Sequence, residues 1–255
     1  MSPSISISEV ASLEDFKESL REVLLLMNLQ ERQNIVERSL SSNEYSRDVS
    51  NALCRASLLM LVAHFEGFLK SLLSYFIDVV VTVRPPVRNL PDSLLELMCS
   101  PFIENVVSAP AGNRAQVLRK SLPHFARMWD PDITASGRFI KEELLVRSLT
   151  SARPVSIDQA FRNIGISSVM ADVSAAISNS EALTEGGTVR LDLAGELAAL
   201  VDRRNQIAHG DKSIKPTASE VQRATVLLAE CSVAMHSSVV SHTSGVCTLG
   251  RTETS

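Results

Sequence analysis

Aromatic residues are scarce in this chain of 255 residues, where they make up 4% of the sequence alongside only ten glycines and ten prolines. Sandwiches and barrels of short strands use many aromatic and β-branched residues and frequent turns, so this composition argues against them. Hydrophobic residues nevertheless make up 45% of the chain, enough to bury a core without covalent staples. The composition therefore predicts an all-α protein.

Clustered metal ligands and disulfide patterns are also missing. The four cysteines are scattered and form no CxxC pair, and the five histidines show no HxxxH spacing. Neither a zinc site nor a disulfide framework is indicated, so we expect no metal and no cofactor. A reducing cytoplasm fits this use of cysteine best.

The chain also lacks an excess of positive charge and an uninterrupted hydrophobic span. Lys and Arg number 25 against 29 Asp and Glu, which argues against coating nucleic acid by bulk charge. The longest apolar stretch, residues 56–83, is interrupted by charged residues such as Glu66 and Lys70, which predicts a buried helix and no membrane span. No basic and then apolar segment opens the sequence, so no secretory signal is expected.

Common catalytic signatures are absent as well. The sequence contains no P-loop, GxGxxG turn, GxSxG elbow or HExxH helix, which disfavours nucleotide hydrolysis and zinc proteolysis. Pro131-Asp132 followed by Lys141-Glu142-Glu143 faintly suggests a metal-dependent nuclease. That chemistry needs the order Glu-x-Lys on a strand, and the order here is wrong.

Apolar residues at three-to-four spacing predict two long helices at the N-terminal end. The first is expected from an N-cap at Ser12 to about Ser39, and the second from after Asn43 to the Arg84-Pro85-Pro86 stop. Together they should form a long antiparallel hairpin.

The middle of the chain, residues 88–187, is punctuated by proline and predicts an irregular insertion of short helices. Its strongest helical candidates are residues 94–98, 117–129 and 169–177, and Glu185-Gly186-Gly187-Thr188 is expected as an exposed loop.

Two further helices are expected near the C-terminal end. One runs from about Asp192 to His209 with Gly210 closing it, and the other opens with a capping box from Thr217 to Glu220. We expect a single domain over residues 1–242 and a disordered tail over residues 243–255.

The end of the helix at 192–209 concentrates polar chemistry in Arg203-Arg204-Asn205-Gln206-Ile207-Ala208-His209-Gly210. At about 100° per residue, Asn205 and His209 lie about 40° apart, so Asn205 can orient His209. Arg204 and His209 lie about 140° apart, so Arg204 must reach around the helix or act with groups on another chain. Its planar fork suits a phosphate oxygen, and the imidazole is a proton donor.

This segment resembles the signature of the HEPN superfamily. That signature is an arginine, usually followed by a polar residue, and then a histidine after four to six intervening positions; Arg204 and His209 are separated by four. The residues Leu58-Leu59-Met60-Leu61-Val62-Ala63-His64-Phe65-Glu66-Gly67-Phe68 resemble the second helix of the RiboL-PSP and MAE-type branches. The residues Ser156-Ile157-Asp158-Gln159-Ala160-Phe161-Arg162-Asn163-Ile164-Gly165-Ile166 resemble the segment before the motif helix. The resemblance spans about residues 53–228.

The resemblance implies a HEPN-like helical bundle that forms a homodimer, with facing motif helices that cleave RNA without a metal. It implies catalytic roles for Arg204 and His209. Many members of the superfamily are toxins or phage-defence effectors, so the resemblance implies such a role here. One branch is controlled by adenylylation of a tyrosine two residues after the histidine. That position is Asp211 here, so the same control is not expected.

Other polar residues near the motif are candidates for supporting roles, and each also has a simpler structural explanation. Glu66 lies on an apolar stripe and needs a partner, and we expect it to position Arg204 or His209, although any basic residue or hydroxyl would satisfy it. Asn205 is a candidate for orienting His209. Arg203, Lys212 and Lys215 could steer RNA, although a solvated surface is the simpler explanation.

The sequence therefore predicts an endoribonuclease of HEPN type that leaves 2′,3′-cyclic phosphate ends. Its expected partners are RNA, a second copy of the chain and an antitoxin or neighbouring-gene protein, with no membrane. The rival is a non-catalytic HEPN scaffold that binds RNA, nucleotide or a partner protein. An interaction module independent of RNA is a third possibility.

Overall fold

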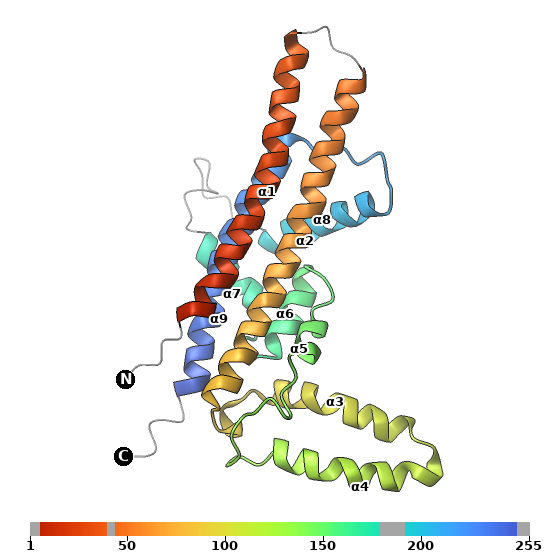
Figure 1. Ribbon diagram of the computed structural model, residues 1–255, viewed down its shortest axis with the longest axis vertical. Coiled ribbons are helices and arrows are strands. Elements are labelled where there is room, and N and C mark those ends of the chain that lie inside the picture. The colour runs from red at the N-terminus through yellow and green to blue at the C-terminus, as the bar shows by residue number, and fades with distance from the viewer. Residues whose placement is uncertain (1–5, 40–43, 179–191, 249–255) are drawn as a thin grey trace. The chain divides into compact units, whose positions relative to one another are not determined.

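The protein is described by a computed structural model that covers residues 6–39, 44–178 and 192–248 (Figure 1). That part of the chain contains nine α-helices, one short 3-10 helix and no strand, which confirms the all-α fold class. The helices are α1 (Ser6–Ser39), α2 (Glu44–Val83), η1 (Val87–Asn89), α3 (Asp92–Ser108), α4 (Ala111–Met128), α5 (Glu142–Ser148), α6 (Pro154–Arg162), α7 (Val169–Ile177), α8 (Leu193–Ala208) and α9 (Ala218–Thr248). The loop expected at Glu185 to Thr188 lies outside the described residues.

The chain divides into two compact units, which are described separately below. Unit 1 comprises residues 1–69, 151–154 and 170–236, and unit 2 comprises residues 70–150, 155–169 and 237–255. Helices α2 and α9 therefore contribute residues to both units. The expectation of one domain over residues 1–242 stays a prediction.

Helices α1 and α2 form the predicted antiparallel hairpin within unit 1. The ring centroid of Phe16 lies 4.9 Å from that of Phe68, Glu22 Oε2 lies 3.2 Å from His64 Nε2, and the side-chain amide of Gln30 donates to Ser50. Partner numbers on α2 fall as the numbers on α1 rise, which is the register of antiparallel helices. The α2 face towards the core buries apolar side chains, among them Leu58, Leu61, Val62, Phe65 and Leu69.

Helix α1 begins six residues earlier than the sequence indicated. The expected N-cap, Ser12, lies inside the helix, which starts at Ser6. Val10 and Ala11 continue the apolar spacing of the helix towards its N-terminus, and this periodicity outweighs the local capping preference of serine.

Both ends of α8 and the beginning of α9 lie where their capping residues predict. The Asp192 carboxylate accepts a hydrogen bond from the amide of Gly195 at 3.0 Å, and Gly210 follows the helix with a φ of +87°. In the capping box, the Thr217 amide donates to Glu220 at 2.8 Å and the Glu220 amide donates to Thr217 Oγ1 at 3.3 Å. The turn at Gly210 and the capping box at Thr217 fix the two ends of the segment that joins α8 to α9.

The last helix is longer than predicted. Helix α9 continues to Thr248, so residues 243–248 are helical where a disordered tail was expected. Thr243 and Val246 are buried, which explains why the helix persists past His242 despite the polar sequence that follows. Residues 249–255 lie outside the described part of the chain.

The proline-rich middle forms longer helices than expected. Helices α3 and α4 each continue through an internal proline that was expected to end a helix. Pro101 lies within α3 and Pro123 within α4. Proline at 101 removes the amide that would bond to the Leu97 carbonyl, and the Ser100 hydroxyl donates to that same oxygen at 2.8 Å. Side-chain compensation thus explains why Pro101 does not end the helix. Helix α7 has the predicted bounds.

Helices α2 and α9 are the two described helices long and apolar enough to cross a membrane by length and composition. About 44% of the most apolar window of each is buried inside the protein, and core helices of soluble proteins meet the same criterion. The burial of α2 agrees with the expectation of a core helix.

Candidate active site

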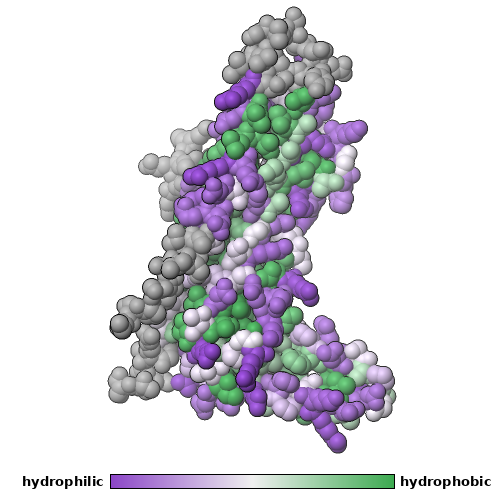
Figure 2. All heavy atoms as spheres, in the orientation of Figure 1, coloured by the Kyte–Doolittle hydropathy of each residue, from purple (hydrophilic) through white to green (hydrophobic). Residues whose placement is uncertain are grey.

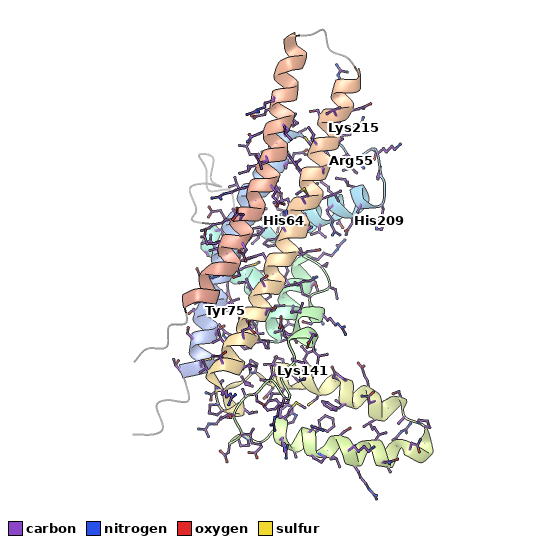
Figure 3. The ribbon with its side chains drawn as sticks, in the orientation of Figure 1. Arg55, His64, Tyr75, Lys141, His209 and Lys215 are labelled. Atoms are coloured by element: carbon purple, nitrogen blue, oxygen red, sulfur yellow. The ribbon has the colours of Figure 1, made fainter. Side chains whose placement is uncertain are left out.

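The C-terminal end of α8 leaves His209 exposed on a fixed backbone. The His209 amide donates to the Asn205 carbonyl at 2.9 Å, and the Gly210 amide donates to the Ile207 carbonyl at 3.0 Å. The positive φ of Gly210 then turns the chain away from the helix. Figure 3 shows His209 at the free end of α8, and among the described residues no group hydrogen-bonds to its ring. The imidazole is therefore open to a ligand.

Glu66 on α2 meets Arg204 on α8, as the sequence predicted for a half-buried carboxylate that needs a partner. Arg204 Nη2 lies 3.5 Å from Glu66 Oε2, and Arg204 Nη1 donates to Asn205 Oδ1 at 3.0 Å. The side chains of Glu66 and Arg204 are 20% and 29% exposed, so both are sheltered without being closed off. We call Glu66, Arg204 and Asn205 the arginine cluster.

Asn205 differs from its expected role. Its side-chain oxygen accepts from Arg204, and no described hydrogen bond joins its side chain to the His209 ring. The same guanidinium also contacts Glu66 of α2. Asn205 therefore orients the arginine in this structure, and its part in orienting His209 stays a prediction.

A short segment before α6, residues 151–154, supports the arginine cluster within unit 1. The Ala152 amide donates to Glu66 Oε1 at 3.3 Å, which leaves Oε2 for Arg204. The next residue, Arg153, forms an ion pair with Asp202 on α8. Residues 151–154 thus contact both the Glu66 carboxylate and helix α8, which carries Arg204.

The loop after α8 is held in place by Arg55 of α2. Its guanidinium donates to the carbonyl oxygens of Asp211 and Ile214 at 2.6 and 2.8 Å (Figure 3). Hydrogen bonds from the hydroxyl and amide of Ser213 lower the pKa of the Asp211 carboxyl, so this group stays charged. Side-chain bonds thus shape the loop directly after His209.

The three residues predicted to steer RNA differ in their surroundings. Arg203 donates to Glu220 at 3.0 Å, because the carboxylate that completes the capping box of α9 lies within its reach. Its charge is therefore partly neutralised, although half of the side chain is exposed. Lys212 and Lys215 are exposed on the loop after α8.

Arg55, Ala152 and Arg153 were missed by sequence reasoning. Arg153 and Asp202 are 49 positions apart, and Arg55 lies 156 positions from Asp211. No spacing rule links residues at such separations. The backbone amide of Ala152 carries no side-chain signal at all. Only the buried Glu66 offered a clue, since its carboxylate required some donor.

Within the described ranges, no group of three or more His, Cys, Asp or Glu residues is placed to hold a metal ion.

An all-helical chain with an Arg-x4-His motif at the free end of a helix has the features of a HEPN protein. The profile of the MAE_28990-like HEPN family matches residues 8–227, which is most of the chain. The protein belongs to this family, which confirms the HEPN resemblance and its MAE-type branch. No curated protein and no solved structure matches the chain.

Proposed function

We propose that the protein is a metal-independent endoribonuclease whose site is formed by two copies of the chain. The observation that supports this function is that Arg204, held by Glu66 of α2 and by Asn205, lies on the helix that ends at the exposed, unbonded ring of His209. HEPN domains often cleave RNA or bind nucleotides, and the family match supports that broader class.

Arg204 supplies the positive charge. Two of its terminal nitrogens contact Glu66 and Asn205, which orients the planar guanidinium while other N–H donors stay available. The contact with Glu66 is long, at 3.5 Å, so a phosphate oxygen can compete for the same nitrogen. Arg204 then stabilises negative charge on the phosphorane-like transition state.

His209 supplies proton transfer. The 2′-oxygen of the RNA attacks the adjacent phosphorus, and His209 of one chain takes the 2′-hydroxyl proton. The bond from phosphorus to the 5′-oxygen breaks, and the partner's His209 donates a proton to that oxygen. The products are a 2′,3′-cyclic phosphate and a 5′-hydroxyl. One imidazole gains a proton and the other loses one, so the pair must exchange protons with water before the next cycle.

The surrounding cations assist binding. Lys212 and Lys215 attract the RNA backbone to the loop beside His209, and Arg203 contributes less because Glu220 neutralises part of its charge. We place this activity in the cytoplasm, as a toxin or phage-defence effector restrained by an antitoxin or another neighbouring-gene protein.

The mechanism is tested with matched RNA substrates that carry either a 2′-hydroxyl or a 2′-O-methyl group at the cleavage position. Because the methyl group blocks the nucleophile and leaves the phosphate intact, we expect cleavage only of the hydroxyl substrate, with cyclic phosphate ends detected by mass spectrometry. EDTA should leave the rate unchanged. Cleavage of the methylated RNA, or loss of activity in EDTA with recovery in magnesium, would refute the mechanism.

The second candidate is a HEPN scaffold that binds RNA, nucleotide or a partner protein without cleavage. It is favoured by the internal engagement of Arg204 with Glu66 and Asn205. Saturable RNA binding by the purified protein, with intact substrate after prolonged incubation, would select the scaffold over the enzyme.

A further inference from the structure

Helix α4 carries a charge opposite to that of the chain as a whole. Its 18 residues include Arg114, Arg119, Lys120 and Arg127 and no carboxylate, whereas the complete chain has a net charge of −4. Such a segregated group of cations in an acidic protein needs an explanation beyond solubility.

The four cations of α4 have different surroundings. Arg114 donates to the carbonyl oxygens of Val107 and Ala109 at 3.3 and 3.5 Å, so it supports the turn between α3 and α4. Arg119, Lys120 and Arg127 are exposed, and none of them forms an ion pair with a described carboxylate. These three residues, here called the α4 basic face, keep their full charge for an external anion.

The α4 basic face lies opposite the surface that packs on α3. At about 100° per residue, its three cations fall within about 100° of arc and span about 12 Å along the axis. The other side of the helix buries Met128 and places Phe125 edge-on against Phe102 of α3, with 5.9 Å between ring centroids. Figure 1 shows the two helices side by side. The angular positions of the residues put the basic face on the other side of α4 from Phe125 and Met128.

Polar and aromatic groups extend the same surface. Gln116 lies on the arc of the cations and Asn113 lies about 20° beyond its edge, and both are exposed. Trp129 directly after the helix is 45% exposed. Hydrophilic side chains are prominent over the α3–α4 hairpin in Figure 2. Guanidinium forks suit phosphate oxygens, amides add hydrogen bonds, and an open indole can stack on a base.

We propose that the α4 basic face is a second RNA-binding surface, which holds substrate phosphates outside the cleavage site. The identity of the anion as RNA rests on the proposed function, and the complementary charge supports it. An anionic bilayer fits less well, because most of the apolar side of α4 packs on α3, although Leu118 and Leu122 are 40% and 51% exposed.

The test compares two triple variants in the complete chain with His209→Ala, which keeps the RNA intact. The first carries Arg119→Gln, Lys120→Gln and Arg127→Gln. The matched control carries Lys70→Gln, Arg138→Gln and Arg147→Gln, which removes the same charge from exposed cations elsewhere in unit 2. Binding of a fluorescent 30-nucleotide RNA is measured at several salt concentrations, with circular dichroism to verify helical content.

We expect the α4 variant to bind at least ten-fold more weakly near 0.1 M salt, with a salt slope reduced by about 2 for three lost phosphate contacts. The control variant should bind like the parent. Equal affinity of the two triple variants would overturn the proposal. So would loss of binding to phosphatidylserine vesicles in the α4 variant with unchanged RNA binding. Because binding is measured without cleavage, an inactive wild type would defeat the proposed function and leave this result interpretable.

Discussion

At the scale of single residues, substitution of His209 should change the activity strongly and the stability very little. Its exposed ring contributes little packing, while its proposed proton transfer dominates the reaction. We predict that His209→Ala lowers the cleavage rate by about 10² to 10⁴-fold and changes the melting temperature by no more than about 2 °C. RNA-end sequencing and thermal melts measure the two effects.

Gln206→Ala provides the matched control for His209, because Gln206 is an exposed residue one turn earlier on the same helix. It should retain wild-type cleavage. A His209→Ala protein that melts several degrees lower and still cleaves RNA would show that the imidazole only caps the helix.

Glu66 is predicted to act through Arg204 and not on the substrate. Glu66→Gln keeps the size of the side chain and an oxygen for the Ala152 amide but loses the charge that orients Arg204. We expect about a ten-fold lower cleavage rate from this change alone and almost no further loss when it is added to Arg204→Ala, since contacting residues are not additive.

The readout is a double-mutant cycle on the single-turnover rate. Fully additive losses would mean that Glu66 acts independently of the arginine, for example as a proton acceptor. A normal pH profile for Glu66→Gln would agree with a positioning role.

At the scale of helices, the capping box of α9 gives a pH-dependent contribution. Bonds from the Thr217 amide and from Arg203 lower the pKa of Glu220, so its stabilisation is present above its ordinary value of 4.5 and is lost as the pH falls through the lower folded value. We predict that Thr217→Ala lowers the free energy of unfolding by about 1 kcal/mol at pH 7, and that Glu220→Gln destabilises the protein more at pH 7 than at pH 3.

Urea unfolding at both pH values measures this, with Gln222→Ala as a control at an exposed position of the same helix. A Glu220→Gln defect that stays constant from pH 7 to pH 3 would contradict the charged capping box.

The helices that the sequence predicts best are those whose signals are local. The two ends of α8 and the beginning of α9 follow from Asp192, Gly210 and the Thr217 box, all within a few residues of the helix ends they define. The lengths of α3 and α4 could not be predicted, because tolerance of an internal proline depends on compensating groups such as Ser100. The pairing of Glu66 with Arg204 was foreseeable from the cost of a buried charge, whereas that of Arg153 with Asp202 was not.

At the scale of the whole molecule, the proposed site requires two chains. Within one chain no described hydrogen bond joins the His209 ring to Arg204, which agrees with their separation of about 140° around α8. We therefore predict a homodimer at micromolar concentration in which both His209 side chains are needed.

At a fixed total concentration of chains, an equal mixture of wild type and His209→Ala, after time for exchange, should have about one quarter of the activity of wild type alone, since only wild-type dimers are competent. Sedimentation velocity checks the dimer directly. Half of the wild-type activity in the mixture, or a monomer that still cleaves RNA, would contradict a site shared between two chains.

The discontinuous make-up of unit 1 also has a consequence during protein synthesis. Glu66 and Arg204 are 138 residues apart in the chain, with most of unit 2 encoded between them. At about 5 to 20 residues per second, a ribosome needs about 7 to 28 seconds to pass from one to the other. The nascent chain therefore exposes the α1–α2 hairpin long before α8 emerges, and a chain released early carries the carboxylate without its arginine. The proposed ribonuclease, assembled in this order, cannot attack the messenger from which it is being translated until its own translation is almost complete.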